Sequence, residues 1–158
     1  MHYTKNIAKH LHEVYNGGNW TWVNLQDTLK DVTWQQATAK VYNFNTIAVL
    51  TYHIGYYADT ILNVLRGNPL ESKDELSFNH PPINNAEDWD AMRNKVKDDW
   101  NNLVAAIEQL PDEKLGEFFV QEKYGIYYRN LHGLIEHTHY HMGQIVILKK
   151  ILQAEEGR

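Results

Sequence analysis

Four long segments with helical character set the strongest limit on the fold of this chain. Turn-forming residues separate them, namely Gly17-Gly18, Gly67-Asn68-Pro69 and Pro111-Asp112, which are typical of helix ends. The predicted helices are residues 3–16, 45–66, 85–110 and 128–153. In a chain of 158 residues, four helices of this length predict an all-α four-helix bundle, in one domain over residues 1–158.

The segments between these helices are expected to be short or irregular. Residues 25–39 resume the helical pattern as one shorter stretch, and residues 112–126 are mixed, with 118–120 a candidate for extended backbone. Residues 68–85 contain three prolines, few apolar side chains and no periodicity. They predict a long loop, and loops of more than about 12–15 residues are often functional.

Composition excludes several classes of function. The chain has no cysteine, so disulfides, thiolate metal sites and cysteine nucleophiles are absent from it. The formal net charge is −5, and Lys149-Lys150 is the longest basic run, which argues against a nucleic-acid partner. The N-terminus lacks the apolar core of a secretory signal, and no apolar stretch reaches the roughly 20 residues of a membrane span. We therefore expect a cytoplasmic protein with no membrane partner.

Nine histidines are present, and four of them lie between residues 132 and 141. Because each helical residue turns the chain by about 100°, His141 lies about 40° from His137 and Gln144 about 20° to the other side. These three side chains share one face, which is otherwise apolar, so it is expected to face inward. His132 and His139 point elsewhere on the predicted helix.

Two imidazoles four positions apart on a helix can bind one metal ion, although two packed or hydrogen-bonded core histidines would give the same pattern. His53 strengthens the metal interpretation, because it lies within a second predicted helix among apolar neighbours. Three inward histidines are costly to bury unless something pairs them. A divalent cation would do so, and the core of a helical bundle is a usual place for such a site.

The whole pattern resembles the DinB/YfiT-like superfamily, whose members are often described as metal-dependent hydrolases. The resemblance covers nearly the whole chain and is carried by His53, by His137-x3-His141-x-Gly143-Gln144, by Gly17-Gly18-Asn19-Trp20, and by Phe78-Asn79-His80-Pro81-Pro82 with Asp88-Trp89. It implies that His53, His137 and His141 are the metal ligands. It also implies an up-up-down-down bundle with long loops, a homodimer, and nickel, zinc or iron in the site. Some relatives transfer low-molecular-weight thiols.

Three neutral imidazoles leave the full charge on the metal and leave coordination positions open, which is the catalytic arrangement. We therefore expect an enzyme that activates water or a thiol, acting as a hydrolase or thiol transferase on a small molecule. Gln144 is a candidate for orienting a ligand or bound water, with a helix–helix hydrogen bond as the alternative. Tyr57 is a candidate donor to substrate or a core tyrosine, and His80 a candidate mobile acid or base.

Two other functions remain open at this stage. One is a non-catalytic, stress-associated metal-binding protein whose ion ties two helices together. The other is an interaction module whose histidines never hold metal. A di-iron carboxylate bundle is set aside, because it needs two E-x-x-H pairs and the chain has one, Glu136 to His139. Trp20 and Trp22 flank a non-helical break. They are candidates for the lining of a pocket mouth, but we favour packing in the core or in a dimer interface.

Overall fold

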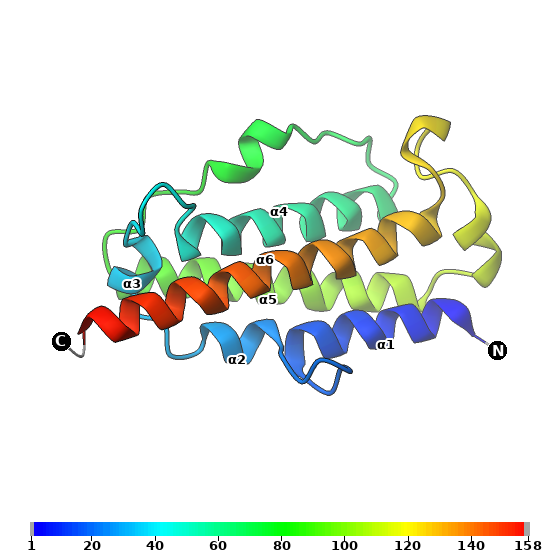
Figure 1. Cartoon of the computed structure of the whole chain (residues 1–158). Coiled ribbons are helices and arrows are strands. Elements are labelled where there is room, and N and C mark those ends of the chain that lie inside the picture. Colours follow the sequence, from blue (N-terminus) through cyan, green and yellow to red (C-terminus); the bar gives the residue numbers. More distant parts are fainter. Residues whose placement is uncertain (1, 157–158) are drawn as a thin grey trace.

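The computed structural model describes residues 2–156, which form an all-α structure (Figure 1). Its α-helices are α1 (Tyr3–Asn16), α2 (Leu25–Leu29), α3 (Trp34–Thr38), α4 (Ile47–Leu65), α5 (Ala86–Glu108) and α6 (Tyr127–Glu156). Three short 3-10 helices lie in the connections, η1 (Asp74–Phe78), η2 (Asp112–Gly116) and η3 (Glu122–Tyr124). The four long helices confirm the predicted helical bundle.

Local capping explains where the helices begin. The Thr46 side chain accepts the backbone N–H of Val49 and caps α4, which begins at Ile47, two residues later than the predicted helix 45–66. The predicted stretch 25–39 divides into α2 and α3, because Thr33 forms a capping box with Gln36 and so starts a second helix.

Within residues 112–126 the chain forms η2, η3 and an isolated β-bridge between Phe118 and Ile126. Of the residues 118–120 that were expected to be extended, Phe118 forms the bridge, whereas Val120 has φ of +67° and is not extended. The bridge holds this connection as a folded turn between α5 and α6.

The directions of the long helices differ from the expected up-up-down-down order. In Figure 1, α4 and α5 run in the same direction, and α1 and α6 run in the opposite one. The order along the chain is thus up-down-down-up. The reason is the segment 66–85, which returns along the outside of the bundle, so that α4 and α5 start at the same end.

Two tryptophans, Trp89 and Trp100, are completely buried in the core, and the indole N–H of each donates a hydrogen bond. Trp100 donates to the carbonyl of Leu11 and Trp89 to that of Val32, each at 2.8 Å. Gly55 lets α4 approach α5 closely, because a Cβ at this position would lie 2.6 Å from Cγ2 of Val96. These contacts fix α5 against α1 on one side and α4 on the other.

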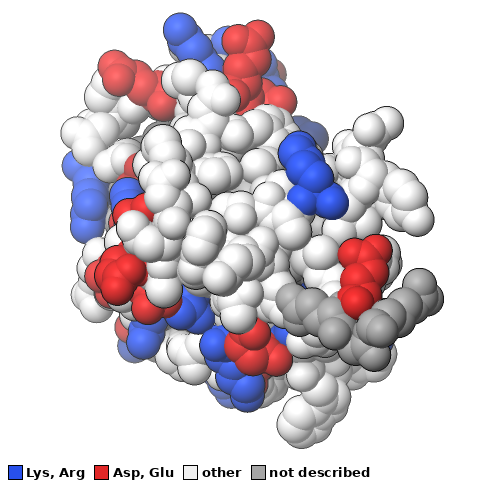
Figure 2. Space-filling view, turned by 90° about the vertical axis from the view of Figure 1, so that its left-hand side faces the viewer, with Lys and Arg blue, Asp and Glu red and all other residues white. Residues whose placement is uncertain are grey.

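The surface shows two further features. Trp20 and Trp22 are 94% and 86% exposed, so the interpretation of these side chains as core residues is wrong. At the end of the bundle that carries α3, charged side chains lie mainly around the edge and the centre is uncharged (Figure 2). Of the helices described, none is both long and apolar enough to cross a lipid bilayer.

Candidate metal centre

Three histidines from two helices meet between α4 and α6. One ring nitrogen of each of His53, His137 and His141 lies within 4.8 Å of those of the other two. The Nε2 atoms of His53 and His137 are 2.9 Å apart. His53 is buried and the other two are half-buried. In the described part of the chain this is the single group of three or more potential metal-binding side chains.

The second ring nitrogen of His53 is held by a residue of the connecting segment. Nδ1 of His53 lies 2.8 Å from Oγ of Ser77, which is itself buried. The Ser77 hydroxyl donates its proton to the carbonyl of Asp74 at 2.5 Å, so its oxygen accepts from His53. This contact fixes the tautomer of His53 and leaves the Nε2 lone pair directed at the group.

His141 is oriented in the same way from within its own helix. Its Nδ1 lies 2.7 Å from Oε1 of Gln144, and an amide oxygen can only accept, so His141 carries its proton on Nδ1. Its free nitrogen is therefore Nε2. Gln144 lies where the sequence placed it, on the ligand face, and it orients a histidine rather than joining two helices.

The loop predicted over residues 68–85 folds over this group. Hydrogen bonds from two tyrosines of α4 anchor its 3-10 helix η1. The Tyr56 hydroxyl donates to the backbone carbonyl of Lys73 and accepts the backbone N–H of the same residue. The Tyr57 hydroxyl donates to the Asp74 carboxylate at 2.7 Å. The ring of Phe78 stacks on that of His53, with centroids 4.2 Å apart. The segment thus covers the buried side of the histidines.

The other two candidates from the sequence take different positions. Tyr57 packs edge-on against the rings of both His53 and His137, with centroids 5.1 and 5.0 Å away. Burial, followed by the hydrogen bond to Asp74, raises its pKa to about 12, so its hydroxyl stays protonated. His80 is not brought into the group. Its Nδ1 lies 2.6 Å from the carbonyl of Pro81, and its ring packs near Tyr52.

Protons cannot satisfy this group of nitrogens. Burial, and then the neighbouring imidazoles, lower the pKa of His137 to about 4, and burial with His141 also lowers the pKa of His53. If all three imidazoles are neutral, His137 can carry its proton on Nε2 and donate it to one neighbouring imidazole. The Nε2 lone pair of the other imidazole then has no donor within the group. A divalent cation would accept all three lone pairs at once.

The distance between His53 and His137 fits such an ion, and the nitrogen of His141 lies within 4.8 Å of both. Nitrogen ligands lie about 2.1 Å from zinc, so two of them on one ion are about 3.0–3.4 Å apart at right-angled to tetrahedral geometry. The 2.9 Å between His53 and His137 is close to the lower value. Imidazole also suits nickel and iron, so the donor set by itself does not select the metal.

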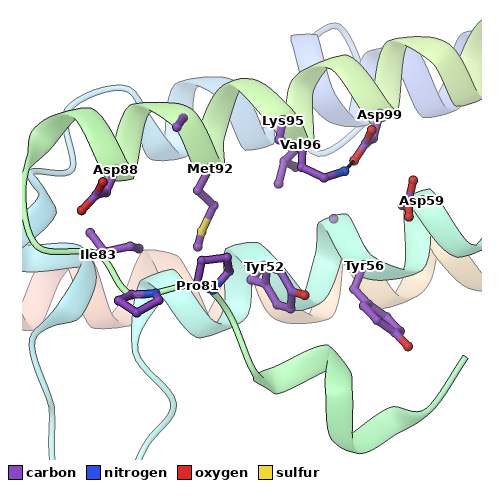
Figure 3. A pocket seen from close by; sticks show the side chains of 13 residues that line it. Tyr52, Tyr56, Asp59, Pro81, Ile83, Asp88, Met92, Lys95, Val96 and Asp99 are labelled. Carbon is purple, nitrogen blue, oxygen red and sulfur yellow. Dashed lines mark hydrogen bonds and ion pairs between the residues drawn. The ribbon is translucent and has the colours of Figure 1, made fainter.

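A cavity of about 580 Å³ adjoins the group on the side of His137. Tyr57 and Asp74 also line it, and apolar side chains from α4, α6 and the loops form much of its wall. A second hollow of about 400 Å³ lies between α4 and α5 (Figure 3). There Tyr52, Pro81 and Met92 point into the space, and none of the three histidines lines it. Of the two, the first cavity is the one that adjoins the three histidines.

Sequence reasoning missed Ser77 and Asp74, and it named Phe78 only as part of the family resemblance, without a role at the histidines. Ser77 lies 24 positions from His53, in a segment without periodicity, so no local pattern connects the two. The one available signal was the unusual length of the loop.

A comparison with protein families matches the family model of the DinB superfamily to residues 19–145. The chain therefore belongs to the DinB superfamily, as the resemblance of its histidines and turns predicted. Comparisons with curated proteins and with solved structures gave no match.

Proposed function

We propose that this protein is a metal-dependent enzyme that acts on a small molecule, with a divalent ion held by His53, His137 and His141. The observation that carries the proposal is the convergence of three imidazoles with too few protons to satisfy them, and the pKa values of His53 and His137 are lowered by burial. Family membership is compatible with a metal-dependent function. The ion is nickel, zinc or iron.

When bound, the metal would act as a Lewis acid and activate water or a thiol at neutral pH. The chain's own residues would prepare the site for this chemistry. Ser77 and Gln144 keep Nε2 of His53 and His141 unprotonated, and η1 covers the buried side. Tyr57 and Asp74 meet at the cavity wall, where the tyrosine can donate only by giving up its bond to Asp74. Hydrolysis and thiol transfer are the two reactions that this arrangement supports.

The cavity beside His137 favours a catalytic ion over a purely structural one. A structural ion that only links α4 to α6 typically has all of its coordination positions filled by protein ligands. Here three histidines supply three ligands, and the adjoining cavity leaves room for a further one. The non-catalytic metal protein and the metal-free interaction module are the alternatives that the following experiment separates.

Metal content tests the proposal directly. Protein purified without chelators or an affinity tag, and then supplied with nickel, zinc or iron(II), is expected to hold about one ion per chain by elemental analysis. His53→Ala, His137→Ala and His141→Ala should each lower that occupancy by at least tenfold, since two imidazoles bind far more weakly than three.

His139→Ala is the matched control, because His139 is also half-buried on α6 but its Nδ1 contacts the Ile135 carbonyl. It should retain full occupancy. Circular dichroism shows whether each variant is folded. Wild-type protein that binds none of the three metals, or an equal loss in His139→Ala, would contradict the proposal.

We propose further that the chain forms a homodimer through exposed apolar side chains beside α6. Trp20 and Trp22 lie in the loop whose Thr21 hydroxyl is 3.4 Å from Nε2 of His139 on α6. Tyr140 and Ile147 are exposed on α6 and lie seven positions apart, on one side of that helix. Large exposed aromatic groups of this kind are typical of protein interfaces.

A further inference from the structure

We infer that the substrate of this centre carries a carboxylate, which Lys123 and Arg129 bind at the end of the cavity away from His137. The inference rests on the proposed function, since it names the substrate class of that same site. Both cations line the cavity that His137 also lines. Neither has a carboxylate within ion-pair distance among the described residues.

The charges of the cavity favour an anion. Its charged lining consists of Lys123, Arg129 and Asp74, and the Asp74 carboxylate already accepts a hydrogen bond from Tyr57. The lining is therefore net positive in a chain whose formal charge is −5. A metal ion at the histidines would add to this positive field, which would attract and orient an anionic ligand.

The second hollow of the molecule has the opposite charge. Asp59, Asp88 and Asp99 line it, with Lys95 as the one cation, and Lys95 is paired with Asp99 (Figure 3). The two hollows on the two sides of α4 thus differ in sign. Of these two hollows, the one with a net positive lining is the one that adjoins the histidines.

The two cations are exposed, and each has a contact in the turn before α6. Nζ of Lys123 lies 4.8 Å from the centre of the Tyr124 ring, a cation–π contact. At Gly125 the backbone has φ of +73°, and a Cβ there would lie 3.0 Å from Cδ of Arg129. Glycine at this position therefore allows both the turn and the packing of the arginine stem against it.

The geometry also sets the length of the ligand. Arg129 and His137 are eight positions apart on α6, which corresponds to about 12 Å along the helix axis. The Arg129 stem packs against Gly125, on the side away from His137, so the side chain does not shorten that span. A ligand that reaches both ends therefore needs at least about five carbons between its reactive group and its carboxylate. The cavity, of about 580 Å³, lies within the range of about 300–1,000 Å³ for small-molecule pockets.

Thiol binding to cobalt(II)-loaded protein tests this inference, with the charge-transfer absorption of the thiolate complex as the readout. The probes are 6-mercaptohexanoate, its neutral match 6-mercaptohexanol, and the shorter pair 3-mercaptopropionate and 2-mercaptoethanol. We expect 6-mercaptohexanoate to bind at least tenfold tighter than 6-mercaptohexanol. The shorter pair should differ by less than threefold, because 3-mercaptopropionate cannot span the cavity.

The Lys123→Gln/Arg129→Gln double variant should lose most of this preference while it binds 6-mercaptohexanol and cobalt as the wild type does. Lys97→Gln is the control for a general loss of positive charge, since Lys97 is exposed on α5 outside the cavity, and it should keep the preference. Equal binding of the two six-carbon thiols by the wild type would overturn the inference and leave the metal centre intact. Failure to bind cobalt would instead overturn the proposed function.

A second experiment, which needs no metal, tests the carboxylate site if the protein binds cobalt but none of the thiols. Hexanoate added to the metal-free protein is expected to shift the Nε–Hε signal of Arg129 in proton–nitrogen NMR spectra, and hexanol is not. If hexanoate leaves that signal unchanged, the assignment of a carboxylate to this end of the cavity is wrong.

Discussion

His137 differs from His53 and His141 in the hydrogen bonding of its Nδ1 atom. Nδ1 of His137 is buried without a hydrogen-bond partner among the described residues, whereas Nδ1 of His53 meets Ser77 and Nδ1 of His141 meets Gln144. His137 is therefore the histidine whose orientation depends most on what lies at Nε2. In the metal-free protein that is Nε2 of His53.

The lowered pKa of His137 predicts how the stability of the metal-free protein depends on pH. In the unfolded chain this imidazole takes up a proton near its ordinary pKa of 6.5, but in the folded protein it does so only near 4. Between these values the unfolded state binds more protons, so the free energy of unfolding should fall as pH is lowered from about 6.5 to 4.

Urea denaturation at a series of pH values in the presence of a chelator measures this effect. The His137→Gln variant lacks the titrating group, so its free energy of unfolding should fall less steeply over the same pH range. Identical slopes for the variant and the wild type would show that His137 titrates normally in the folded protein.

At the scale of the helices, the packing of α4 against α5 depends on a glycine. Substitution of Gly55 by alanine would place a Cβ against the stiff, β-branched side chain of Val96, at 2.6 Å. The gain in helix propensity is about 1 kcal/mol, and overpacking of a core typically costs about 1–3 kcal/mol. We expect Gly55→Ala to lower the free energy of unfolding by up to about 2 kcal/mol.

Gly133→Ala provides the matched comparison for this substitution. Gly133 lies within α6, and a Cβ there would meet nothing within 4 Å. The change should stabilise the protein slightly through helix propensity alone, by up to about 1 kcal/mol. Denaturation curves of both variants give the test, and a Gly55→Ala protein as stable as Gly133→Ala would show that α4 and α5 are not closely packed.

The whole molecule offers a test of the proposed homodimer. Sedimentation equilibrium should give twice the 18.5 kDa mass of the chain. Trp22→Ser should weaken the association by at least tenfold, because Trp22 is a large exposed aromatic side chain beside α6. Tyr42→Ser is the control, since Tyr42 is also 85% exposed but lies in the α3–α4 connection. A wild-type protein of monomer mass would refute the dimer.

The elements that the sequence predicted well are those with local causes. The start of α5 at the cap Asn85 and the end of α1 before Gly17 follow from residues next to each boundary. The long span of α6 follows from its uninterrupted pattern. The split of residues 25–39 was missed because the capping box at Thr33 lies inside a stretch whose hydrophobic pattern continues across it.

The sequence by itself determined the helices and the pairing of His137 with His141, because helical spacing places residues four positions apart on one face. The tertiary structure alone decided what these two histidines meet. His53 reaches His137 across 84 positions of the chain, and the order up-down-down-up sets α4 beside α6 at that level. Ser77 behind His53 comes from the connection between α4 and α5, whereas Lys123 and Arg129 in the cavity wall come from η3 and the first turn of α6. Their positions follow from the path of the chain around the bundle, which no local pattern encodes.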